Sequence, residues 1–155
     1  MTYRITGLSP EPFAALSLLD DAALAARGAI RVTATAKPGF PCRITLEDAE
    51  VGEELFLLHH VSHDVATPFR SAYAIYVRTG ARETATYHDA LPPVFEGRPI
   101  ALRGFDEAGM LRGALLAGPG QADEQIRALF ARDEIATIHA HNAAHGCFAA
   151  RIERA

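Results

Sequence analysis

The strongest constraint on the fold is the way short apolar runs are paired across polar turns. Residues 100–105 and 110–117 are extended runs joined by a polar segment, residues 106–109, which ends in glycine as hairpin loops often do. Residues 135–141 and 146–152 form a second such pair. Helical patterns occur only near the two ends, without a regular alternation of strand and helix. The sequence therefore predicts an α+β fold with a mainly antiparallel sheet built from hairpins.

Further strands are predicted by shorter apolar patterns. Ile30 and Val32 alternate with polar residues, as in a half-buried strand. Leu55 to Leu58 is apolar at consecutive positions, which favours a strand covered on both faces, ended by His59 and His60 and followed by a loop. The strands expected from such patterns cover residues 3–6, 30–36, 44–46, 55–58 and 73–77.

Capping residues predict helices near both ends of the chain. Ser9 is the expected N-cap of a first helix, and Asp20 or Asp21 that of a second helix, which Gly28 ends. Residues 122–132 give the best helical pattern, with apolar side chains on one face and acidic residues in the first turn. We therefore expect helices near the N-terminus and before the closing hairpin.

Length and charge limit the class of protein. A chain of 155 residues predicts a single globular domain over residues 1–155, and its composition, 49% hydrophobic and 22% charged, is ordinary for a soluble protein. The net charge of −4 argues against a nucleic-acid partner, which needs a basic face. No run approaches the roughly 18 apolar residues that span a bilayer, and no secretory signal is visible. We expect a cytoplasmic protein without a membrane partner.

The chain has two cysteines, Cys42 and Cys147, and in the cytoplasm both are expected to stay as reduced thiols. A disulfide between them stays an alternative, because the Cα separation that decides it cannot be read from sequence.

The richest chemistry lies in the closing hairpin. Residues 138–148 contain three of the seven histidines and one of the two cysteines. Strand alternation places His139 and His141 on one face. If apolar Ile138 and Phe148 share the other face, Cys147 and Arg151 lie with the histidines. This argument predicts a loop with an odd number of residues, over 142–146.

Three interpretations compete for this face. The first is a metal site with His139 and His141 as ligands and His145 or Cys147 as the third. The second is nucleophilic catalysis by Cys42 or Cys147 with a histidine as base. The third is structural, because histidines at strand ends often bond to backbone and free cysteines are often core residues.

Other histidines receive weaker assignments. His59, His60 and His63 are interpreted as structural, because neighbours in a regular strand face opposite ways. His88, in a predicted loop, is given no role. Asp48 is interpreted as a turn former.

Three stretches together carry a resemblance. They are Pro38-Gly39-Phe40-Pro41-Cys42-Arg43 with residues 46–49, Leu102-Arg103-Gly104-Phe105-Asp106 with residues 109–110, and His139-Ala140-His141-Asn142-Ala143 with residues 146–151. In this order and spacing they resemble the bacterial family catalogued as domain of unknown function 1203, over nearly the whole chain. The resemblance implies a stand-alone bacterial domain and brings no activity, cofactor or ligand. The His145 region and the His59-His60 pair match the pattern poorly, which lowers the weight of His145 as a metal ligand.

Together these observations predict a pocket where the Cys42-Arg43 turn meets the His139/His141 face. As a binding module it takes a small anionic molecule, with Arg43, Asn142, Cys147 and Arg151 as candidate ligand-binding residues. As an enzyme it uses Cys42 as nucleophile, His139 or His141 as base and Arg43 as binder of an anionic group. As a metalloprotein it uses His139 and His141 as ligands. The sequence names neither a cofactor nor an oligomeric state.

Overall fold

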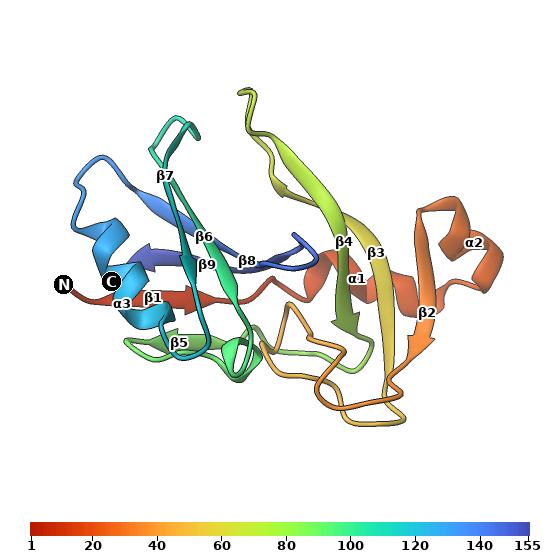
Figure 1. Cartoon of the computed structure of the whole chain (residues 1–155). Coiled ribbons are helices and arrows are strands. Elements are labelled where there is room, and N and C mark those ends of the chain that lie inside the picture. The colour runs from red at the N-terminus through yellow and green to blue at the C-terminus, as the bar shows by residue number, and fades with distance from the viewer.

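Two antiparallel sheets form the framework of the α+β fold (Figure 1). The structure is a computed structural model that describes all residues 1–155. The larger sheet has the strand order β5-β1-β9-β8-β6-β7 and the smaller one the order β2-β3-β4. The strands of the larger sheet are β1 (Tyr3–Thr6), β5 (Thr86–His88), β6 (Ile100–Phe105), β7 (Leu111–Ala117), β8 (Thr137–Asn142) and β9 (Phe148–Arg154). Those of the smaller sheet are β2 (Ala29–Thr33), β3 (Glu54–His63) and β4 (Ser71–Arg78).

The helices are short and lie where the sequence predicts them, near the N-terminus and before the closing hairpin. They are α1 (Glu11–Ala14), α2 (Asp21–Ala26) and α3 (Ala122–Phe130), with 3-10 turns η1 (Ala15–Leu18) and η2 (Pro93–Phe95). The Asp20 side chain caps α2 by accepting from the Ala23 amide at 2.8 Å, and Gly28 follows the helix with a φ of 69°. Pro10 rather than Ser9 takes the N-cap position of α1, and the Ser9 hydroxyl accepts from the Glu11 amide at 3.3 Å. No helix has the length and apolar character needed to cross a bilayer.

The predicted β6–β7 hairpin is present, and Asp106 and Gly109 each have a clear role in closing its loop. Asp106 Oδ1 accepts from the amides of Ala108 and Met110, both at 2.9 Å, while Gly109 adopts a φ of 79°. An acidic residue that bonds the backbone two and four residues ahead, followed by a glycine at positive φ, closes a tight loop.

The larger sheet has one apolar and one polar face. The apolar face carries Ile5, Ile138 and Ile152 against α3, whose Ile126 and Phe130 complete the main core. The opposite face carries a row of mainly polar side chains that crosses the paired strands, namely Thr86, Thr6, Arg151, His139 and Arg103. The two faces follow directly from side-chain alternation along each strand.

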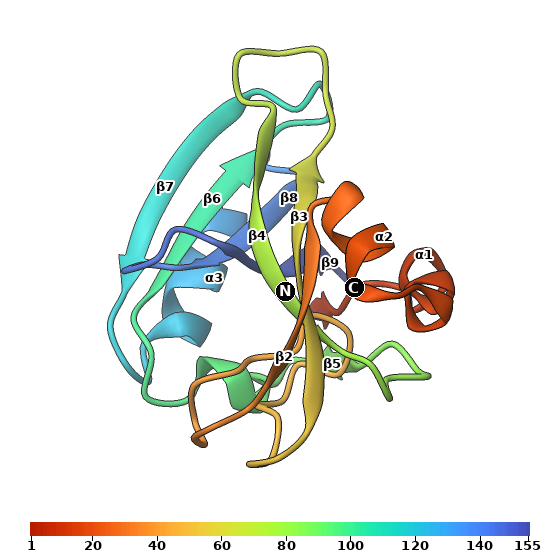
Figure 2. The same cartoon turned by 90° about the vertical axis from the view of Figure 1, so that its right-hand side faces the viewer.

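The smaller sheet lies beside the larger one in both views (Figures 1 and 2), and the ring contacts of β3 are with the polar face of the larger sheet. The far end of β3 makes this contact: the His63 ring lies 4.0 Å from the Phe105 ring and 5.0 Å from the His139 ring, between centroids. Aromatic and imidazole rings therefore make the contact at this end of β3.

Several strand predictions need correction. Residues 44–46 form no strand, because Leu46 adopts a φ of 53° and its amide closes a turn onto the carbonyl of Cys42. Ile30 is 53% exposed, whereas its neighbour Ala29 is buried opposite Leu58. Val32, on the same face as Ile30, packs against the buried cluster of Ala34, Ala49 and Leu55, so the buried side of the segment changes along its length. An isolated alternation does not say which of its two faces a neighbouring strand covers.

The strand predicted to end at His59 and His60 continues to His63. Pairing with β4 extends it, with His59 opposite Ala74 and His60 opposite Tyr73, and a bulge follows before His63. His88, predicted to lie in a loop, is the last residue of edge strand β5 and pairs with Arg4. In both cases pairing with a neighbouring strand, and not the local sequence, decides how far the strand extends.

The closing hairpin is present, but its predicted register is wrong at one point. Ile138 pairs with Ile152 and His139 with Arg151, as the alternation requires, whereas His141 pairs with Phe148. The register shifts between these pairs because β9 carries one extra residue. Phe148 therefore lies with the histidines, not with Ile138, and Cys147 lies on the other side. The loop outside the strands covers residues 143–147 rather than 142–146.

Candidate functional site

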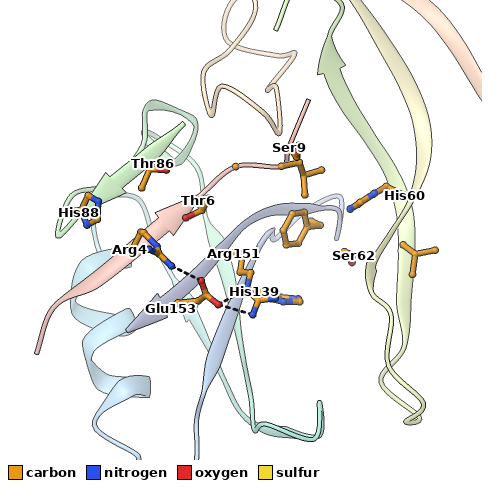
Figure 3. A pocket seen from close by; sticks show the side chains of 14 residues that line it. Arg4, Thr6, Ser9, His60, Ser62, Thr86, His88, His139, Arg151 and Glu153 are labelled. Atoms are coloured by element: carbon orange, nitrogen blue, oxygen red, sulfur yellow. Dashed lines mark hydrogen bonds and ion pairs between the residues drawn. The ribbon is translucent and has the colours of Figure 1, made fainter. Parts of the chain in front are cut away.

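Five of the predicted site residues line two hollows on either side of the closing hairpin, whereas Cys42 and His141 line neither. We call the first, of about 520 Å³, the polar pocket. Its lining includes Arg4, Thr6, Ser9, His60, Ser62, Thr86, His88, His139, Phe148, Arg151 and Glu153 (Figure 3). We call the second, of about 410 Å³, the thiol pocket. Its lining includes Pro41, Arg43, Tyr73, Tyr76, Arg98, Pro99, Asn142, Ala143, His145 and Cys147.

Two guanidinium groups share one carboxylate in the polar pocket. Glu153 accepts from Arg151 at 2.7 Å and from Arg4 at 3.2 Å, and Figure 3 shows the three side chains converging. Arg4 faces Glu153 across the β1–β9 ladder, and Arg151 stands two residues before Glu153 on the same face. The group has one more positive than negative charge and is partly exposed, so an anion in the pocket meets a favourable field.

His139 forms the inner wall of the polar pocket. Its side chain is 3% exposed and is surrounded by the rings of His63, Phe105 and Phe148, at 5.0 to 5.4 Å between centroids. Its Nδ1 is the only buried side-chain nitrogen or oxygen without a hydrogen-bond partner in the protein. Burial, with smaller contributions from neighbouring histidines and arginines, lowers its pKa from the usual 6.5 to about 3. The ring is therefore a neutral polar group at neutral pH.

Strand β3 contributes the opposite wall of the polar pocket. His60 points from β3 toward the hairpin in Figure 3, and its ring centroid lies 6.1 Å from that of Phe148. Burial, and then the nearby charge of Arg43, lower the pKa of His60. Ser62 adds a hydroxyl from the same strand. This wall is present because β3 continues past the point where the sequence predicts its end.

His141 lies outside both pockets. Its Nδ1 donates to the carbonyl of Gly146 at 2.9 Å, and its ring packs edge-on against Phe148. Burial lowers its pKa to about 4 despite that hydrogen bond. No group of three or more His, Cys, Asp or Glu side chains is placed to hold a metal ion. The two histidines of the predicted metal site therefore have no third ligand from this chain.

Arg43 connects the 39–43 turn to the closing hairpin. Its side chain, 2% exposed, donates from Nε to the Phe148 carbonyl at 2.8 Å, from Nη1 to the Pro41 carbonyl at 2.6 Å and from Nη2 to Cys147 Sγ at 3.0 Å. The predicted meeting of the turn with the hairpin therefore occurs, but through Cys147 and Phe148 rather than through the histidines.

The two cysteines are free and have different environments. Cys42 is fully buried in the core of the smaller sheet, and only the backbone amides of Ile44 and Arg78 approach its sulfur, at 3.4 and 3.3 Å. Cys147 is 8% exposed and accepts from Arg43 and from the Asn142 side chain. No histidine nitrogen bonds to either sulfur, so the predicted pairing of Cys42 with His139 or His141 is absent.

The predicted site residues include only His139 and Arg151 of those that line the polar pocket. The alternation of Arg4 and Thr6 with two apolar residues in the first strand does signal a polar face, and it was available. His60 and His88 carry no such signal, because pairing with β4 and with β1, rather than the residues around them, decides where they face. Arg151 is the only predicted ligand-binding residue that lines the polar pocket.

Comparison with known proteins places these residues in a family. Residues 39–154 match the family described as protein of unknown function (DUF1203). No curated protein and no solved structure matches the chain. The matched range includes both pockets apart from β1 and the segment that follows it, which contribute Arg4, Thr6 and Ser9. Because the match covers well over half of its length, the chain belongs to the DUF1203 family.

Proposed function

We propose that the polar pocket binds a small molecule carrying a carboxylate or phosphate group. The observation that carries the proposal is the unpartnered His139 ring at the wall of a pocket with excess positive charge. A buried polar atom without a partner costs about 1–3 kcal/mol, and native proteins contain few such atoms. An apolar ring would fit the same aromatic surroundings at no such cost, so retention of the imidazole supports a role in binding.

The arginines supply the attraction for the anion. Arg4 and Arg151 hold two positive charges against the single carboxylate of Glu153, in a chain whose net charge is −4. A guanidinium presents several donors in a plane, which suits the paired oxygens of carboxylate and phosphate. In this proposal an anion exchanges with part of the Glu153 interaction, and a small shift of the buried His139 ring brings its unpartnered Nδ1 to the anion.

The location of the protein, the state of its thiols and its class of partner belong to the same proposal. The protein acts in the cytoplasm with both thiols reduced, and no nucleic-acid partner is included because the net charge is negative. The thiol–imidazole enzyme gains no support, since no histidine nitrogen forms a hydrogen bond with either sulfur, although His145 lines the same pocket as Cys147. Binding of a small anion thus remains the function that the geometry supports best.

The test is a titration of the full chain with inorganic phosphate and with malonate, followed by two-dimensional amide NMR. We expect saturable shifts on β1, β8 and β9, and an affinity at least about tenfold lower for Arg151→Ala, because one of two guanidinium groups is lost. Arg27→Ala is the matched control, since Arg27 is an exposed arginine beyond the end of α2. Shifts equal to those caused by chloride at the same ionic strength, or equal losses in the two variants, contradict the proposal.

A further inference from the structure

The thiol pocket contains a second set of reactive groups, on the opposite side of the hairpin from the polar pocket. Cys147 Sγ accepts from Arg43 Nη2 at 3.0 Å and from Asn142 Nδ2 at 3.5 Å, and all three side chains line the hollow. A cationic donor next to a sulfur stabilises the thiolate, which is the nucleophilic form of cysteine.

Arg43 is a buried cation without a carboxylate partner. Its acceptors are two backbone carbonyls and the sulfur of Cys147. A guanidinium has five N–H groups, so two of them have no acceptor in the protein while the side chain lines the hollow. Buried charges in proteins are normally paired. The unused donors therefore point to an oxygen-bearing anion beside Cys147.

We propose that Cys147 is a nucleophile and that the thiol pocket takes a small electrophile carrying a carboxylate, held by Arg43. In the reaction the thiolate electron pair forms a bond to the electrophilic carbon, and the leaving group departs with the electrons of its own bond. With iodoacetate as the probe, a carbon–sulfur bond forms, the carbon–iodine bond breaks and iodide is released. No residue lines both pockets, and the polar pocket enters this site only through the Phe148 backbone carbonyl that accepts from Arg43, so the proposal stands or fails independently of the function proposed above.

Cys42 provides an internal reference for the same chemistry. It lies one residue before Arg43, yet its sulfur is fully buried and accepts only from backbone amides. Arg43 bonds to the more distant cysteine in sequence. The difference predicts selective reaction of one thiol in a two-thiol protein.

The experiment compares iodoacetate with iodoacetamide, which lacks the carboxylate but transfers a group of nearly the same size. The native full chain is treated with each reagent, and the modification of each cysteine is followed by peptide mass spectrometry, with glutathione as the unstructured thiol. We expect Cys147 to react at least about tenfold faster than Cys42, because only Cys147 has a cationic donor and an opening to solvent. We also expect a preference for iodoacetate over iodoacetamide several times that of glutathione.

Two variants locate the source of the preference. Arg43→Lys keeps the charge but not the planar set of donors, and we expect the iodoacetate preference to fall toward that of glutathione. Asn142→Ala removes only the amide donor, so the preference should persist with a slower reaction. If Arg43→Lys fails to fold, the ratio of the iodoacetate rate to the iodoacetamide rate at Cys147 of the unaltered chain still tests the proposal. A ratio for native Cys147 no higher than that of glutathione, or reaction only after unfolding, overturns the proposal.

Discussion

At the scale of single residues, His139 is the side chain whose buried polar atom has no hydrogen-bond partner. It places a neutral imidazole among three other rings and leaves one nitrogen without a partner. Stability alone favours an apolar ring at such a position, because packing would be kept and the polar atom removed. Residues that reduce stability in this way are found mainly at functional sites.

Replacement of His139 separates its effect on stability from its effect on anion binding. His139→Phe keeps the ring packing, so we expect the free energy of unfolding to stay equal or to rise by about 1 kcal/mol, while phosphate binding in the polar pocket is lost. Urea unfolding and the NMR titration measure the two effects. His59→Phe, at an exposed position of β3, is the control and should leave binding unchanged. A large loss of stability in His139→Phe would mean that the imidazole is structural.

At the scale of elements, the 39–48 segment is held by a buried ion pair. Asp48 accepts from both terminal nitrogens of Arg98, at 2.7 and 2.8 Å, and from the amide of Gly39 at 3.0 Å. Burial raises the pKa of Asp48, but the Arg98 and backbone donors outweigh it and the net pKa is lowered. A residue expected only to form a turn thus fixes the loop that carries Arg43.

Removal of this carboxylate should destabilise the chain strongly. We expect Asp48→Ala to lower the free energy of unfolding by about 3 kcal/mol, because it leaves a partly buried guanidinium and an amide unpaired. Glu50→Ala, in the same segment, removes an exposed carboxylate that pairs with Lys37 and should cost less than about 1 kcal/mol. Chemical denaturation of both variants measures the difference; similar losses would show that Asp48 acts only as a turn residue.

The comparison of sequence with structure also belongs to this scale. The hairpins, the α3 helix and the cap of α2 could be predicted, because their signals lie within about a dozen neighbouring residues. The facing of Ile30, the extension of β3 to His63 and the register at Phe148 could not, because each depends on a partner strand or on one extra residue. The candidate site follows the same rule: the sequence predicts the turn and the hairpin as its parts, but their residues line two separate pockets, and Cys42 and His141 line neither.

At the scale of the whole molecule, the junction of the two sheets is sensitive to acid. His139 and His141 both lie near this junction, and burial lowers their pKa values to about 3 and about 4. In the unfolded chain both regain a pKa near 6.5 and bind protons that the folded chain excludes. The unfolded state is therefore favoured increasingly as the pH falls below about 6.5.

The expected outcome is a free energy of unfolding that is constant above about pH 7 and decreases toward pH 4. Each histidine adds a slope of up to about 1.4 kcal/mol per pH unit in this range. His139→Phe should remove one such contribution and flatten the curve, whereas His59→Phe should not. Urea denaturation at intervals between pH 4 and 8 provides the measurement. Parallel curves for His139→Phe and the unaltered chain would contradict the assigned burial of the imidazole.

The extra residue in β9 has a consequence for the compatibility of the two chemistries. A thiolate and an imidazole on one strand face would be free to chelate soft metals together or to exchange protons. The register shift before His141 turns Phe148 toward the histidines and Cys147 toward Arg43, so that an aromatic ring and the strand itself lie between the two groups. One extra amino acid in β9 thus separates the Cys147 thiol from His139 and His141, and leaves His145 as the histidine that shares its pocket.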